Sequence, residues 1–88
     1  MKAVILYHPK SDHATNVEGF ARDFSMQTGH RIELISLESR DGAATATMYD
    51  ITQYPAILAL DNAGQMLRLW QGPVLPLMNE ISYYTQDH

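Results

Sequence analysis

Residues 49–60 have the sequence Tyr49-Asp50-Ile51-Thr52-Gln53-Tyr54-Pro55-Ala56-Ile57-Leu58-Ala59-Leu60. This stretch consists of a helix-like segment, one proline, and an apolar run that is typical of a buried strand. The turn residues Asp61-Asn62-Ala63-Gly64 follow, and after them a second strand-like segment and Gly72. Because Gly64 lies where a tight connection needs a positive φ, residues 56–60 and 65–70 are predicted to form a β-hairpin.

The first half of the chain predicts a strand and then a helix. Residues 3–7 are an unbroken apolar run, as expected of a strand that is covered on both faces. From residue 11 to residue 28 the apolar spacing becomes helical, with one face made of Val17, Phe20, Ala21 and Phe24. We expect Ser11 or Asp12 to cap the start of this helix and Gly29 to end it in the left-handed conformation.

The remaining segments complete an α/β order. Residues 31–37 are predicted to be a strand, residues 42–49 a short helix, and residues 75–84 a last helix. The apolar stripe of that last helix is Leu77, Met78, Ile81 and Tyr84. A right-handed βαβ unit gives parallel neighbours, and the hairpin adds an antiparallel pair. We therefore predict one domain over residues 1–84, a four-stranded mixed sheet in the order β-α-β-α-β-β-α with helices on both faces, and a loose tail at residues 85–88.

Size and charge narrow the class of protein. A chain of 88 residues has room for one core, and its 6 Lys+Arg against 10 Asp+Glu give a net charge of −4. The cations are scattered and form no basic stripe, which disfavours nucleic acid as a partner. The apolar run near the start is too short for a signal-peptide core or a membrane span, so we expect a cytoplasmic protein that is not bound to a membrane.

The chain has no cysteine. Disulfides, thiolate nucleophiles and thiolate metal sites are therefore excluded. This absence matters because the predicted element order, the Tyr54-Pro55 junction, the Gly-containing turn and Gly72 before the last helix resemble the thioredoxin-like, or glutaredoxin-like, family over nearly the whole chain. In that family a Cys-x-x-Cys motif follows the first strand and opens the first helix, whose N-terminus lowers the thiol pKa.

Helix register indicates which residues occupy the motif position. In the family, core-facing residues lie three, six, seven and ten positions after the second cysteine, and the apolar face of residues 17–24 has those offsets from Ala14. The motif position is then Ser11-Asp12-His13-Ala14, with Ser11 in place of the attacking cysteine. A loop one residue longer would give Asp12 and Thr15 instead, and that register would put Glu18 in the core.

Without sulfur, the motif position allows few other chemistries. Ser11 is interpreted first as a helix N-cap. Glutathione transferases resemble this fold and can use serine to stabilise a bound thiolate, so a small-thiol-binding enzyme that uses Ser11 is an alternative. Ser11, Asp12 and His13 are adjacent and point in different directions, which disfavours a hydrolytic triad. His8, Asp12 and His13 lack an evident fourth ligand, so we expect no metal site and no cofactor.

The resemblance also implies a groove at the proline. In the family this proline has a cis peptide bond, and the backbone of the preceding residue pairs with an extended substrate. Carried over, Tyr54 would face a groove floored by Pro55, with Ser11, Asp12 and His13 on one wall and the turn around Gly72 on the other. Such a groove can bind an extended peptide by strand addition without a thiol. The plainer interpretation is that Pro55 only shapes the entry into the strand.

The sequence supports three hypotheses of function. The first is a redox-inactive binding or structural module that holds an extended peptide or protein partner at the proline groove, and the second is the glutathione alternative. The third is a homo-oligomeric scaffold built through an edge strand, either residues 31–37 or residues 65–70. We also expect Trp70 to cover the end of the core under the last helix. The methionines expected to fill the core are Met26, Met48, Met66 and Met78.

Overall fold

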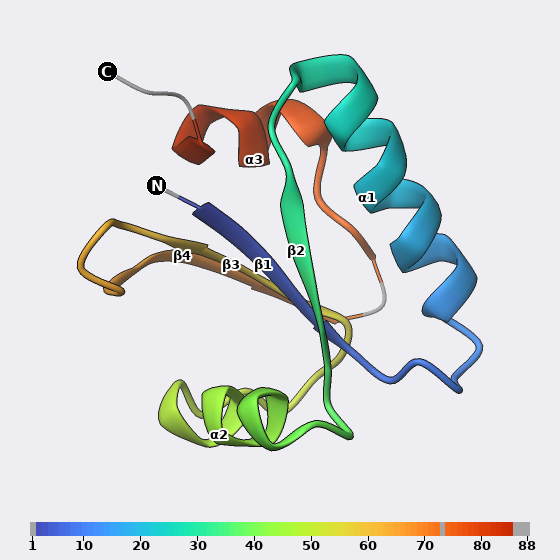
Figure 1. The fold of residues 1–88 in the computed structure, drawn as a ribbon, viewed down its shortest axis with the longest axis vertical. Helices are drawn as coiled ribbons and strands as arrows, with labels where there is room; N and C mark the ends of the chain where they lie inside the picture. The colour runs from blue at the N-terminus through green and yellow to red at the C-terminus, as the bar shows by residue number, and fades with distance from the viewer. Residues whose placement is uncertain (1, 73, 86–88) are drawn as a thin grey trace.

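The described residues have the predicted α/β order. The structure is a computed structural model that describes residues 2–72 and 74–85. In chain order (Figure 1) its elements are β1 (Lys2–Tyr7), α1 (Ala14–Thr28), β2 (Ile32–Ser36), α2 (Arg40–Met48), β3 (Ala56–Leu60), β4 (Met66–Gln71) and α3 (Met78–Thr85). Thr85, which was predicted to begin the tail, is the last residue of α3. The rest of that tail lies outside the described residues.

The strands of the described chain form one mixed sheet in the order β2-β1-β3-β4. β1 and β2 run parallel, whereas β3 is antiparallel to both β1 and β4. Ile5 at the centre of β1 lies opposite Leu34 of β2 and Ile57 of β3. The register between β3 and β4 shifts at Ala59 and Leu60, which leaves Leu67 as the extra residue of a bulge. The predicted four-stranded mixed sheet is thus confirmed.

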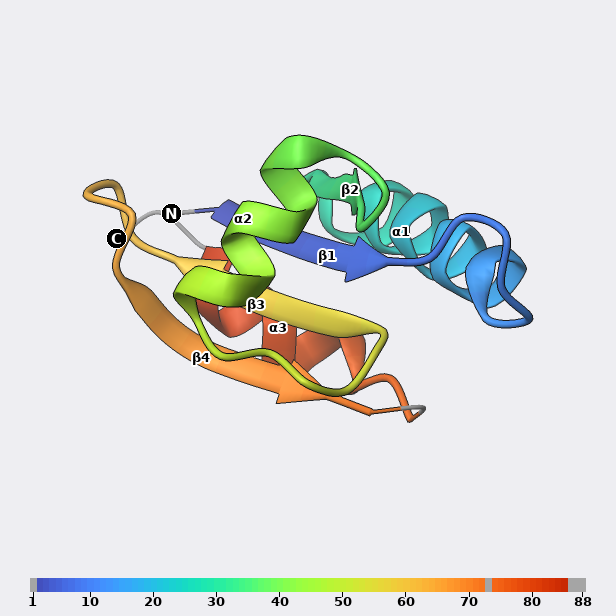
Figure 2. The same cartoon turned by 90° about the horizontal axis from the view of Figure 1, so that it is seen from below.

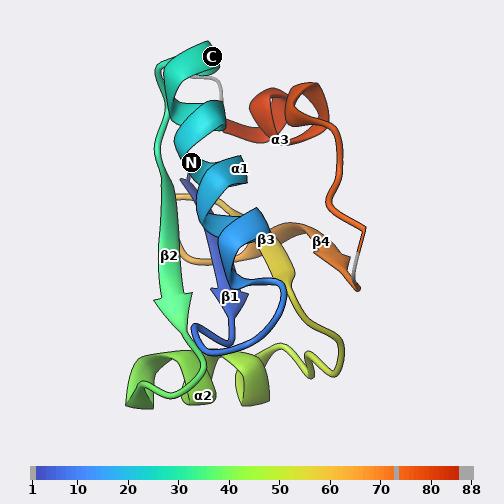
Figure 3. The same cartoon turned by 90° about the vertical axis from the view of Figure 1, so that its right-hand side faces the viewer.

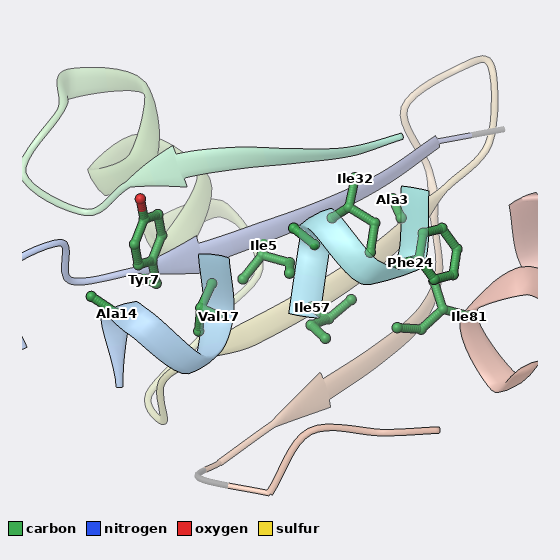
Figure 4. Close-up of a cluster of buried hydrophobic side chains, with 10 residues drawn as sticks. Ala3, Ile5, Tyr7, Ala14, Val17, Phe24, Ile32, Ile57 and Ile81 are labelled. Atoms are coloured by element: carbon green, nitrogen blue, oxygen red, sulfur yellow. The ribbon is translucent and has the colours of Figure 1, made fainter. Parts of the chain in front are cut away.

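Helices cover both faces of the sheet, as predicted. Seen in Figures 1 and 3, α1 and α3 lie on one side of the sheet and α2 lies on the other. Side chains alternate along β1, so successive residues enter two different cores. The α1/α3 core (Figure 4) consists of Ala3, Ile5, Tyr7, Ala14, Val17, Ala21, Phe24, Ile32, Ile57 and Ile81. The α2 core consists of Val4, Leu6, Ile51, Ala56, Leu58 and Leu60.

α1 ends as predicted but begins differently. Gly29 has a φ of 77° and donates its backbone N–H to the Ser25 carbonyl, which closes the helix in the left-handed conformation. At the other end the N-cap residue is His13, and its side chain accepts no capping hydrogen bond. The predicted cap at Ser11 or Asp12 was therefore wrong. Ser11 lies in a turn two residues before this cap, and its hydroxyl donates to the His8 carbonyl.

α2 begins two residues earlier than predicted because Ser39 caps it. The Ser39 hydroxyl accepts the Gly42 N–H at 3.0 Å and donates to the Ser36 carbonyl at 2.6 Å. Gly42 is buried, and a β-carbon at this position would collide with the Ser36 backbone carbonyl. A glycine is therefore required where α2 approaches the end of β2, and this close approach fixes the position of the helix.

The hairpin between β3 and β4 has the predicted turn. The Asp61 carboxylate accepts backbone N–H groups from Ala63 at 2.9 Å and Gln65 at 2.8 Å. Gly64 has a φ of 85°, in the left-handed region that favours glycine. These interactions close the connection at the end of the hairpin that lies away from Pro55.

The apolar surface differs from prediction in two places. Met26 and Met48 are 78% and 72% exposed and Met66 is 40% exposed, so only Met78 of the four methionines packs against a core. Met26 and Met48 lie in helices and Met66 lies at the start of the edge strand β4, and each of these side chains faces solvent. Leu77 precedes α3 and is 68% exposed, while Ile81 of the predicted stripe is fully buried. Trp70 packs against the α1/α3 core as predicted.

Candidate binding surface at the end of β1

Sheet topology brings the loop after β1 to the start of β3. Leu6 near the end of β1 pairs with Ala56 at the start of β3, and the two strands are antiparallel. The chain therefore leaves β1 toward α1 at the place where Tyr54-Pro55 enters β3. We call residues 8–13 the β1–α1 loop. It contains the residues at the predicted motif position, Ser11, Asp12 and His13.

Hydrogen bonds fold the β1–α1 loop back on itself. The Ser11 hydroxyl and backbone N–H both donate to the His8 carbonyl, at 2.7 and 3.1 Å. The His8 backbone N–H donates to Nε2 of His13 at 3.2 Å. His13 Nε2 is thus an acceptor, which places the ring proton of the neutral imidazole on Nδ1. Ser11 and His13 are each bonded to His8 and not to one another, so no hydrolytic relay joins them.

His8 connects this loop to the proline junction. Its ring packs edge-on against the Tyr54 ring, with centroids 5.4 Å apart and an interplanar angle of 74°. The centroid of the His13 ring lies 6.2 Å from that of the His8 ring. Sequence reasoning considered His8 only as a metal ligand and missed this role. The available signal was its place, directly after the apolar run of β1 and before Pro9.

Burial and neighbouring charge set the protonation of the loop. Burial lowers the pKa of His13 below its ordinary value, His8 lowers it further, and the Asp12 carboxylate opposes both effects. A neutral His13 at neutral pH fits its role as the acceptor of the His8 N–H. At the end of β1, burial, followed by the charge of Glu18, raises the pKa of the Tyr7 hydroxyl, so Tyr7 stays protonated.

Tyr54 and Pro55 occupy the centre of the surface. The peptide bond between them is cis, and Pro55 is buried. The Pro55 carbonyl accepts the Gly72 N–H at 3.2 Å, and the Tyr54 hydroxyl donates to the Ile51 carbonyl at 3.0 Å. Within residues 2–72 and 74–85, the Tyr54 backbone N–H and carbonyl have no hydrogen-bond partner. Among the described residues, the backbone N–H and carbonyl of Tyr54 are thus unpaired at the end of the sheet.

The other flank of the junction is closed by the end of β4. The side-chain oxygen of Gln71 accepts the N–H groups of Thr52 and Gln53, at 3.3 and 3.4 Å. Gly72 is buried with a φ of 114°, and the side-chain oxygen of Gln53 lies 3.3 Å from the place a β-carbon would take. Gly72 therefore leaves room for Gln53. The structure places the predicted residues on two sides of Tyr54-Pro55: His8 and the β1–α1 loop toward β1, and Gly72 toward β4.

The candidate surface around Tyr54 and Pro55 does not coincide with either of two hollows on the described residues. Two hollows lie elsewhere on the described surface, one lined by Lys2, Ala3 and residues 31–34, the other by Lys2 and residues 61–64. Both lie toward the start of β1, at the opposite end of that strand from Tyr7. Among the residues that the structure describes, no three His, Asp or Glu side chains gather as a metal ion would require.

Compared by sequence, the chain matches no protein-family model and no curated protein. Its structure is similar to that of thioredoxin 1 from the thermophilic eubacterium Thermosipho africanus TCF52B, with a TM-score of 0.66 over 96% of this chain and 89% of that chain. The chain has a thioredoxin-like fold. At 12% identity the thioredoxin likeness shows the fold alone. Since the chain has no cysteine, the thiol–disulfide exchange of thioredoxins is chemically impossible for it.

None of the helices described for this thioredoxin-like chain is both long enough and apolar enough to cross a membrane.

Proposed function

We propose that this thioredoxin-like domain binds an extended polypeptide segment by backbone pairing at Tyr54, beside the β1–α1 loop. The observation that carries the proposal is the unpaired Tyr54 peptide position among the described residues. Strand addition draws its affinity from main-chain hydrogen bonds, so it needs no thiol. This chemistry is available to a chain without cysteine.

The ladder indicates where an added strand would lie. Ala56 pairs with Leu6 of β1, and this pair is the last of the antiparallel ladder between the two strands. Tyr54 lies two residues earlier, across the cis bond to Pro55 and beyond the end of β1. An incoming segment would continue the line of β1 at this position, where the chain itself turns away through His8.

Aromatic side chains give this position its specificity. The His8 ring lies near both the Tyr54 ring and the His13 ring, with centroids 5.4 and 6.2 Å away. Apolar or aromatic side chains of a bound segment would pack against these rings, whereas the exposed Asp12 of the same loop adds a negative charge. A neutral or basic extended segment therefore fits better than an acidic one, in agreement with the net charge of −4.

The glutathione alternative has less support from the geometry. It requires the Ser11 hydroxyl to donate its proton to a bound thiolate. That proton is donated to the His8 carbonyl at 2.7 Å, so a thiolate would have to replace an existing hydrogen bond. Saturable glutathione binding that is lost in Ser11→Ala would favour this alternative over the peptide.

An NMR titration tests the proposal. The ¹⁵N-labelled protein is titrated with ribonuclease A that has been reduced and carbamidomethylated, an unfolded basic polypeptide. We expect amide shift changes at Tyr54 and in residues 8–14. His8→Ala should weaken binding about two- to thirteenfold, because an aromatic contact contributes roughly 0.5–1.5 kcal/mol.

His30→Ala is the matched control, since His30 lies beyond the other end of α1 and should leave the affinity unchanged. An absence of shift changes at Tyr54 and residues 8–14 at the highest polypeptide concentration would contradict the proposal. Shift changes confined to β4 would also contradict it.

A further inference from the structure

The two outer strands of the sheet differ in how well their edges are protected. On β2, Glu33 is exposed and forms an ion pair with Lys2 of β1 at 3.8 Å, and charged side chains discourage pairing at an edge. On β4 the charged residue is Arg68, and its neighbours Met66 and Leu67 are 40% and 43% exposed apolar side chains. Figure 2 shows β4 at the outer margin of the sheet, with no other described segment beyond it.

Backbone parity shows which groups of β4 face outward. The Gly72 N–H donates to the Pro55 carbonyl, so this pair bonds across β3 and β4. The pair of Trp70 and Ile57 lies two residues earlier in the same ladder, so the backbone groups of Trp70 also point toward β3. The N–H and carbonyl groups of Leu69 and Gln71, at the alternate positions, therefore point away from the sheet. Among the residues that the structure describes, no strand pairs with this edge of β4, so these groups are open to a further strand.

We infer that β4 pairs antiparallel with β4 of a second copy of this chain, with Leu69 on the two-fold axis. A two-fold axis between antiparallel strands places one residue opposite itself. Leu69 suits this position because its outward N–H and carbonyl can exchange both hydrogen bonds with their counterparts. An axis at Arg68 would put two guanidinium groups directly opposite one another, and like charges in that position are destabilising.

The Leu69 register also gives electrostatic complementarity. It puts Arg68 opposite Trp70 of the second copy, and does so twice. Within one chain the Arg68 guanidinium already lies 5.3 Å from the centre of the Trp70 ring, which shows that this cation can reach an indole face. It also puts Leu69 against Leu69 on the α2 side, where this side chain is partly exposed. An unrelated peptide would lack this paired arrangement, so a second copy is the better occupant.

The interface is expected to be weak. One six-residue strand and its flanking side chains form a contact at or below the lower limit of stable interfaces, about 1,200 Å². The dimer should therefore form in a concentration-dependent way. The inferred dimer uses the edge of β4 and not the surface at Tyr54. Its test is therefore independent of the test of peptide binding.

Sedimentation equilibrium tests the association directly. We expect the molar mass of the natural chain to double as its concentration rises from the low-micromolar to the millimolar range. A constant monomer mass throughout that range would overturn the inference.

Single cysteines test the edge and the register, because the natural chain has none. In the Leu69 register the two Cα atoms of residue 69 lie about 5.5 Å apart, which allows a disulfide. In the same register Arg68 faces Trp70 of the second copy, so the two Cα atoms of residue 68 are displaced by two residues along the strands. They lie more than about 8 Å apart, which is too far for a disulfide. Oxidation should convert Leu69→Cys to a covalent dimer while Arg68→Cys and Leu34→Cys remain monomeric.

A covalent dimer of Leu34→Cys, on the other edge, would overturn the choice of β4. A dimer of Arg68→Cys would overturn the axis at Leu69. Leu69 is partly buried against the α2 core, so far-UV circular dichroism is used to check that each variant is folded. If Leu69→Cys is unfolded, the molar mass of the natural chain still decides whether the chain associates.

Discussion

The centre of the sheet and the β1–α1 loop are built in different ways. At the centre, β1 and β3 contribute apolar side chains to cores on both faces, and these contacts join residues far apart in the sequence. In the loop, His8, Ser11 and His13 bond mostly to one another over five residues. The first region holds the thioredoxin-like fold together, whereas the second can change its chemistry without disturbing it. This separation explains how the fold persists without any sulfur nucleophile.

The largest effect is expected in the core. Phe24 of α1 is fully buried, so Phe24→Ala should lower the free energy of unfolding by about 3–5 kcal/mol through lost burial and a cavity. Met26, two residues further along the same helix, is 78% exposed, and Met26→Ala should change it by less than about 0.5 kcal/mol. Urea denaturation followed by circular dichroism measures both. Equal losses in the two variants would contradict the assignment of the buried face.

Two helical glycines differ in the room that surrounds them. A β-carbon at Gly42 would meet the Ser36 backbone carbonyl, so Gly42→Ala should destabilise the protein by about 1–3 kcal/mol. At Gly19 of α1 the nearest atom belongs to the flexible Arg22 side chain, 3.9 Å away. Gly19→Ala should therefore stabilise the protein by about 0.5–1 kcal/mol, because alanine favours the helix. Thermal unfolding of both variants gives the two signs, and stabilisation by Gly42→Ala would show that α2 does not approach β2 closely.

Two serines test the corrected start of α1. Ser39 caps α2, so Ser39→Ala should lower the free energy of unfolding by about 1 kcal/mol. Ser11 caps no helix and only bonds to the exposed His8 carbonyl, so Ser11→Ala should cost less than about 0.5 kcal/mol. Chemical denaturation of both variants is the measurement. A cost at Ser11 as large as that at Ser39 would restore the capping role that the structure removes.

The smallest effect concerns the pH dependence of stability. The pKa of His13 is lower in the folded chain than its ordinary value of about 6.5, because burial and His8 disfavour the charged form. Its contribution to stability is therefore present above pH 6.5 and is lost as the pH falls through the folded pKa. His13→Gln should flatten the fall in melting temperature between pH 7 and pH 5, whereas His30→Gln should leave it in place. An unchanged pH profile in His13→Gln would contradict the partly buried, neutral imidazole.

Periodicity predicted the fold because the core follows simple patterns. The run in β1, the helical spacing of Val17 and Phe24, and the turn at Gly64 each have one dominant physical cause, and the structure confirms all three. The start of α1 was mispredicted because backbone turns within residues 8–13 place Ser11 two residues before the N-cap residue His13, and this loop has no period that would reveal them.

The candidate surface was predictable only in part. The resemblance drew attention to Ser11 and Tyr54, but the link between them is a ring contact of His8 that joins distant parts of the chain. No local pattern reports such a contact. The exposed methionines were mispredicted for a similar reason, since composition does not reveal which face of an element the rest of the fold leaves open.

The contact between the His8 and Tyr54 rings joins the β1–α1 loop and the Tyr54-Pro55 junction into one continuous surface. Nuclear Overhauser spectra of the free protein test this contact through cross-peaks between ring protons. We predict cross-peaks between the His8 and Tyr54 rings, which pack edge-on with centroids 5.4 Å apart. If the His8 ring shows contacts only to its own loop and none to Tyr54, the two segments are separate and the account of the surface is wrong.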